Sequence, residues 1–193
     1  MVSYHQVISV GCLLNRINIK NRLCLSTGGP RWFFDAYINT MFKITIIAVG
    51  KVKEKFWQEA LKEYQKRLKP YVVLDMLEVK AESFGVHNRQ SAQNKENQRL
   101  LAVLAKYDKQ NIYLLAERGQ EFDSIGFANF IKAKSELVLV IGGALGWAEE
   151  IKIKYTKSIS LSQLTMPHEM ARVVLLEQIY RAATIIQNKE YHY

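Results

Sequence analysis

Three short segments of the sequence combine glycines or small polar side chains with the ends of apolar runs, at residues 114–119, 141–146 and 161–168. Each follows a run that is typical of a buried strand, and ligands of parallel α/β sheets bind at the carboxyl ends of strands. Glycines there let a ligand approach the backbone closely. The third segment precedes a proline-started helix, and its backbone groups suit the edge of an adenine. Taken alone, the second segment is better explained as an ordinary tight turn and the third as a loop before a helix, so only the combination of the segments points to a ligand site.

Other familiar motifs of nucleotide and metal chemistry are absent from the sequence. It has no GxxxxGK[ST] phosphate loop, no GxGxxG after its first strand-like run and no HExxH. Its 4 histidines do not cluster at the spacing of metal ligands, and neither Cys12 nor Cys24 belongs to a CxxC pair. We therefore expect no metal site and no disulfide framework, which favours a reducing compartment.

From residue 41 onward, strand-like and helix-like patterns alternate. Apolar runs typical of strands cover residues 42–49, 71–79, 111–116, 137–141 and 158–161. Helical spacing of apolar side chains covers residues 53–69, 91–107, 123–134, 148–155 and 169–187, with Asp123 as the expected cap of the third helix. This alternation predicts an α/β fold, with a mostly parallel sheet and helices on both faces.

The last predicted helix is apolar around most of its circumference. Such a helix is buried on more than one side, either in the centre of one subunit or against a second copy of the chain. Glu177 and Arg181 stand four residues apart and are expected to pair on the remaining polar strip, which also holds Arg172.

Residues 1–40 differ in pattern from the rest of the chain and are expected to lie outside a domain of residues 41–193. A signal peptide is disfavoured because the segment has no basic start and no small-residue cleavage site. A transit peptide would suit its four basic and one acidic side chains, but the segment is not rich in serine. We favour an upstream start, with Met41 as the natural initiator.

The charge and hydropathy of the chain limit its partners. The formal net charge is +9, which favours a polyanionic partner such as nucleic acid but also simply promotes solubility. Lys51, Lys53, Lys55 and Arg89 are candidates for contacts with phosphates. No apolar run approaches the length that spans a bilayer, so we expect a soluble, cytoplasmic protein.

Taken together, the three segments and the last helix resemble the ribosomal RNA large-subunit methyltransferase H family of the SPOUT superfamily. The similarity is most specific in the C-terminal part, where it includes Arg172 and the pair Tyr191-His192. The other matching stretches are residues 47–51, 141–143, 160–168 and 176–182. The resemblance covers residues 41–193, whereas residues 1–40 have no counterpart.

This resemblance implies an enzyme that uses S-adenosylmethionine to methylate N3 of a pseudouridine in 23S ribosomal RNA on the 70S ribosome. It also implies a homodimer and a C-terminal trefoil knot that forms the cofactor site. Matching positions imply cofactor contacts from Leu115, Gly142, Leu161, Ser162, Gln163, Leu164, Thr165 and Met166. They place the catalytic candidates His192, Tyr191 and Arg172 near the target base, with His192 first in line to orient or deprotonate it.

The chain departs from the family pattern at Ala116, at the Ala144-Leu145 pair and at Tyr193. Two alternatives therefore stay open beside the main interpretation. One is a SPOUT methyltransferase for another ribosomal or transfer RNA position, and the other is a ribosome-binding module that has lost catalysis.

Overall fold

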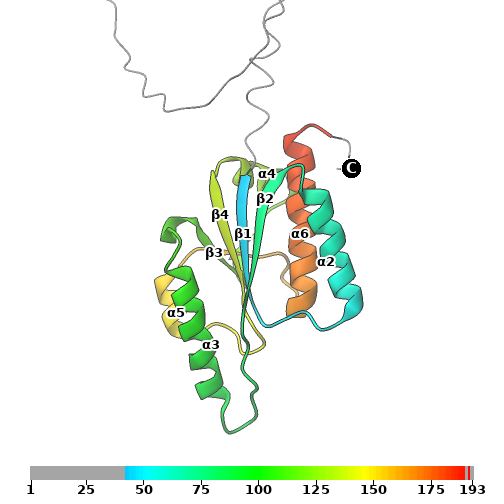
Figure 1. Cartoon of the computed structure of the whole chain (residues 1–193). Helices are drawn as coiled ribbons and strands as arrows, with labels where there is room; N and C mark the ends of the chain where they lie inside the picture. Colours follow the sequence, from blue (N-terminus) through cyan, green and yellow to red (C-terminus); the bar gives the residue numbers. More distant parts are fainter. Residues whose placement is uncertain (1–41, 190, 192–193) are drawn as a thin grey trace, which may run out of the picture. The chain divides into compact units, whose positions relative to one another are not determined.

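The computed structural model of the protein describes residues 42–189 and Tyr191. Five strands form one sheet in the order β2-β1-β4-β3-β5 (Figure 1). The strands are β1 (Phe42–Val49), β2 (Val72–Val79), β3 (Ile112–Gln120), β4 (Glu136–Ile141) and β5 (Ser158–Ile159). Every pairing in this sheet is parallel, so the predicted α/β fold with a parallel sheet is confirmed.

Helices cover both faces of the sheet, as predicted (Figure 1). On one face lie α2 (Lys55–Leu68), α4 (Ser124–Lys132) and α6 (His168–Ile186), and on the other lie α3 (Arg89–Leu104) and α5 (Glu149–Lys154). A short 3-10 turn, η1 (Lys109–Asn111), leads into β3. None of the helices in the described part of the chain is long and apolar enough to cross a membrane.

The central strand β4 is buried on both of its faces, as its unbroken apolar run predicts. Leu137, Leu139 and Ile141 pack with the layer that contains α6. Val138 and Val140 point the other way and pack with α3 and α5. Two apolar cores therefore sandwich the sheet and fix the positions at which its strands end.

The structure corrects several predicted element ends. Strand β3 runs on to Gln120, whereas β5 has only two residues. The two strands meet closely at Gly119, because a Cβ there would lie 2.4 Å from the carbonyl carbon of Ile159. The predicted cap of α4 is confirmed, since the Asp123 carboxylate accepts a hydrogen bond from the Gly126 N–H at 2.6 Å.

Helix α6 packs against α2 and α4 as well as against the sheet. The predicted pair is present, with Arg181 Nη2 at 2.7 Å from Glu177 Oε1. Arg172, which was expected on the same polar strip, is instead only 1% exposed. Residues 1–40 lie outside the described residues.

Candidate functional site

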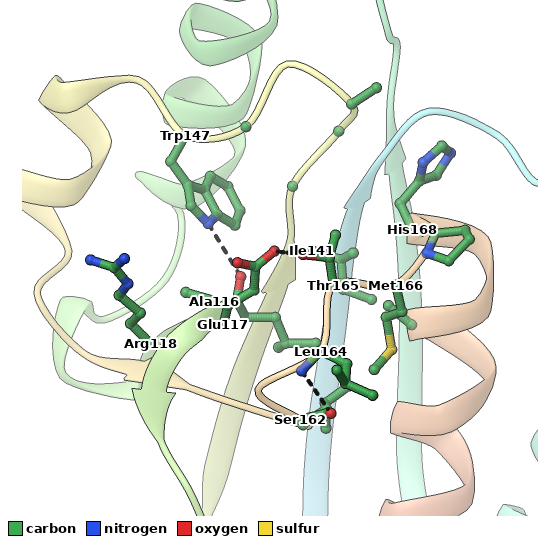
Figure 2. Close-up of a pocket in the computed structure, with 18 residues that line it drawn as sticks. Ala116, Glu117, Arg118, Ile141, Trp147, Ser162, Leu164, Thr165, Met166 and His168 are labelled. Atoms are coloured by element: carbon green, nitrogen blue, oxygen red, sulfur yellow. Dashed lines mark hydrogen bonds between the residues drawn. The ribbon is translucent and has the colours of Figure 1, made fainter.

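The three segments singled out in the sequence meet around one cavity of about 900 Å³, here called the first cavity. It lies beside residues 115–118 of β3, at the end of β4, and where the chain runs from β5 into α6 (Figure 2). Seven of the eight residues expected to contact a cofactor line it: Leu115, Gly142, Leu161, Ser162, Leu164, Thr165 and Met166. The eighth, Gln163, is not part of the wall, and its side chain lies 3.5 Å from Glu121 Oε2.

Trp147 forms a wall of the first cavity that the sequence did not suggest (Figure 2). Its indole N–H donates to the Leu115 carbonyl at 3.2 Å and so ties the loop after β4 to β3. Its ring lies over Gly142, where a Cβ would be 3.3 Å away. Gly142 therefore makes room for an aromatic side chain of the protein itself. The only signal in the sequence was an aromatic residue after a glycine-rich turn.

The segment between β5 and α6 is fixed by its own hydroxyl groups. Ser162 Oγ accepts from the Leu164 N–H at 3.0 Å, and Ser160 Oγ donates to the Ser162 carbonyl at 3.0 Å. Thr165 Oγ1 donates to Glu117 Oε1 at 2.5 Å, which connects this segment to the end of β3. Since these hydroxyls hold the loop, a ligand would be recognised largely by the backbone that they order.

The resemblance implies that Arg172 lies near the target base, and the structure places its side chain beside the turn after β1. Its guanidinium donates to the carbonyls of Val49 and Gly50 at 3.0 and 2.7 Å, and to Glu78 Oε1 at 3.1 Å. The side chain is 1% exposed and does not line the first cavity. Arg172 therefore fixes the turn after β1, and within one chain it is a positioning residue.

His168 begins α6 and is half buried at the edge of the first cavity (Figure 2). Burial lowers the pKa of its imidazole, and the positive charge of Arg172 lowers it further. The ring therefore favours its neutral form, which can accept a proton.

A second cavity, of about 780 Å³, adjoins the first. Gly143, Ala144 and His168 line both cavities and form their common boundary. The rest of the second cavity comes from the ends of β1 and β2 and from α3, including Glu96. Two phosphate-contact candidates, Lys51 and Lys53, belong to its wall, whereas Lys55 and Arg89 do not.

Tyr191, the C-terminal candidate within the described residues, does not line either cavity within one chain. The Tyr191 ring packs on Tyr180, with ring centroids 4.9 Å apart, and Arg181 lies over it. Tyr180 follows His168 on α6 by twelve residues, which is about 18 Å along the helix axis. His192 lies outside the described residues.

Among the residues that the structure describes, no three His, Cys, Asp or Glu side chains gather closely enough to hold a metal ion. The first cavity has the size of a site for a small organic molecule. Its wall combines the Trp147 ring, the Glu117 carboxylate and an ordered polar loop, a combination of groups that suits a nucleoside with a cationic substituent.

The comparison with known families identifies the class of protein. The family described as "Predicted SPOUT methyltransferase" matches residues 42–192. The chain belongs to this family, whose members take the transferred methyl group from S-adenosylmethionine. The residues around the first cavity fit that cofactor in size and in chemistry.

Proposed function

We propose that the protein methylates N3 of a pseudouridine in 23S ribosomal RNA, on the ribosome and in the cytoplasm, with S-adenosylmethionine bound in the first cavity. The observation that carries this proposal is the convergence of seven family-matching residues on that cavity. They come from three segments that are separate in the sequence, within β3, after β4 and after β5, so their meeting is not a consequence of closeness in the sequence. The net charge of +9 suits an RNA substrate.

In this proposal the residues of the protein mainly hold and align the reactants. S-adenosylmethionine brings an activated methyl group on a sulfonium, and N3 must face that methyl and lose its proton. The loop held by Ser162 and Thr165, together with Trp147, would hold the adenosyl group. His192 and Tyr191 would orient the target base, as the resemblance implies.

We further propose that two copies of the chain form each complete site. The tail follows the end of α6 that lies away from the first cavity, so it reaches this cavity only from a second copy. Exposed apolar side chains support such a contact, because Leu164 at the rim is 77% exposed and Met170 on α6 is 39% exposed. The C-terminal trefoil knot that the resemblance implies is part of this proposal.

We also propose that residues 1–40 are not part of the methyltransferase domain. The family match begins only at residue 42. A chain that starts at Met41 is then expected to bind S-adenosylmethionine as tightly as the full chain, which a calorimetric titration of both would check.

The direct test of function is methyl transfer from labelled S-adenosylmethionine to intact ribosomes, compared with naked ribosomal RNA. We expect transfer to the ribosomes, and mass mapping of the digested RNA should place the label on one 3-methylpseudouridine. Label on another ribosomal position, or on transfer RNA only, would instead identify a different SPOUT substrate. Cofactor binding without transfer to any RNA would indicate a module that has lost catalysis.

A further inference from the structure

Within the proposed function, we infer that the second cavity receives the target base. We further infer that Glu96 at its inner wall accepts a hydrogen bond from the ring N–H that distinguishes pseudouridine from uridine. The two cavities share Gly143, Ala144 and His168, so a group that passes from one to the other crosses only this boundary. The carboxylate of Glu96 reaches the same boundary, because a Cβ on Gly143 would lie 3.3 Å from its Oε2.

Glu96 is a buried acid in the wall of the second cavity, and its Oε2 lies beside Gly143 on the boundary with the first cavity. The residue is 5% exposed, and its Oε1 accepts from the Glu82 N–H at 2.8 Å. Among the ion pairs of the described residues, none involves Glu96. A buried carboxylate is costly without hydrogen-bond donors. A ligand that brings an N–H to Oε2 would supply such a donor.

The other carboxylates of the second cavity are already engaged. Glu78 pairs with Arg172, and Glu82 pairs with Arg99. Both carboxylate oxygens of Glu169 accept from the backbone N–H of Lys53, each at 3.3 Å. Glu96 is therefore the acid of this cavity that is best placed to recognise a donor on a ligand.

The rim of the second cavity suits the rest of a nucleotide. Lys51, Lys53 and Lys80 are exposed in its wall and offer positive charge to phosphodiester groups. Phe84 is 46% exposed in the same wall and offers a face for stacking on a base. The cationic rim, the exposed aromatic ring and the buried hydrogen-bond acceptor together suit a base within an RNA chain.

A carboxylate accepts hydrogen bonds but does not donate them, so it selects for ring N–H groups. Uridine has one such group, at N3, because its N1 carries the ribose. Pseudouridine is joined to ribose through carbon and keeps a second N–H at N1. When N3 faces the methyl donor, N1–H remains as the donor for Glu96. Glu96 is thus a specificity-determining residue for pseudouridine.

The test compares single-turnover methyl transfer to ribosomes that carry pseudouridine or uridine at the mapped position. We expect the wild-type protein to favour pseudouridine by at least about tenfold, as for a hydrogen bond to a charged group. In Glu96→Gln the amide oxygen must still accept from the Glu82 N–H, so its NH₂ group faces N1–H. The ratio of the rate on pseudouridine ribosomes to the rate on uridine ribosomes should therefore fall toward one, while the affinity for S-adenosylmethionine stays unchanged.

Glu150→Gln is the matched control, because it removes an exposed carboxylate on α5, outside both cavities. It should keep the wild-type preference. The ratio of the two rates is insensitive to partial unfolding, which lowers both rates equally. If the wild-type protein methylated both kinds of ribosome at equal rates, or if Glu96→Gln kept the wild-type ratio of these rates, the role of Glu96 would be overturned. Absence of any transfer by the wild-type protein would instead reject the proposed function.

Discussion

Arg172 contributes to the site through the backbone that it holds. Its guanidinium joins the carbonyls of Val49 and Gly50 to Glu78 on the neighbouring strand β2. The turn after β1 belongs to the wall of the second cavity, so its position depends on this buried cation. A sequence cannot separate a buried arginine from one that contacts substrate, because both are single cations on an apolar helix.

Replacement of Arg172 by Ala should destabilise the protein by roughly 2–4 kcal/mol, since it leaves two carbonyls and one carboxylate without their donor. The free energy of unfolding in urea measures this loss. Lys152→Ala is the control, because it breaks an exposed pair on α5 and should cost less than about 0.5 kcal/mol. If Arg172→Ala lowered the free energy of unfolding no more than the control does, Arg172 would not hold the turn after β1.

The lowered pKa of His168 predicts a pH dependence of stability. The unfolded chain binds a proton at this histidine more readily than the folded chain does, because burial and Arg172 disfavour the cation. Stability should therefore be unaffected above about pH 7 and should fall as the pH drops below about 6.5. Glu169 opposes this effect and Lys53 adds to it.

Urea unfolding at pH 7.5, 6.5 and 5.5 checks this expectation. His168→Gln should reduce the slope of stability against pH, whereas His87→Gln in the exposed loop before α3 should keep it. If the free energy of unfolding changed with pH by the same slope in the wild-type protein and in both variants, His168 would not contribute to the pH dependence of stability.

At the scale of elements, the sequence predicted which strands and helices exist better than where they end. The apolar run of β4 specified a buried strand because burial on both faces leaves no polar position. The end of β3 was missed, because Glu117, Arg118 and Gln120 are polar, and because Gln120 pairs with Ile159 of β5 only beyond an irregular stretch of the strand. Gly119 marks this contact, but a glycine near a strand end is equally typical of a turn.

Gly119→Ala should disrupt the contact between β3 and β5. The added Cβ would meet the backbone of Ile159 and Ser160 at 2.4–2.7 Å, and backbone atoms cannot move aside as a flexible side chain can. We expect a loss of about 2 kcal/mol or more, as for an overpacked core, together with weaker cofactor binding.

Unfolding in urea and a titration with S-adenosylmethionine measure these two effects. Gly85→Ala is the matched control, since its Cβ would have only Asn88 Oδ1 nearby, at 4.0 Å. If Gly119→Ala were as stable as that control, the close approach of the strands would be refuted.

At the scale of the whole molecule, the sequence located the first cavity because two of its walls, after β4 and after β5, follow strand ends, which parallel topology gathers at one edge. Trp147, Glu117 and the second cavity were missed, because their roles depend on contacts between distant segments. The place of the tail also needed the structure, which shows Tyr191 packed beside Tyr180 of α6.

Mixed dimers test whether one chain completes the site of its partner. Deletion of residues 190–193 removes the tail, and Ala116→Trp fills the first cavity, so each variant alone should be inactive. In an equal mixture after subunit exchange, half of the dimers are mixed and contain one intact site each. We expect roughly a quarter of the wild-type rate to return. No recovery, or a monomer in sedimentation, would count against shared sites.

The central claim is that the first cavity binds S-adenosylmethionine, and a calorimetric titration tests it most directly. The wild-type chain and Ala133→Trp, an exposed substitution after α4, should bind one cofactor per chain. Ala116→Trp should bind none, because the indole occupies the cavity. Absence of binding by the wild-type protein at millimolar cofactor, or unchanged binding by Ala116→Trp, would contradict the account.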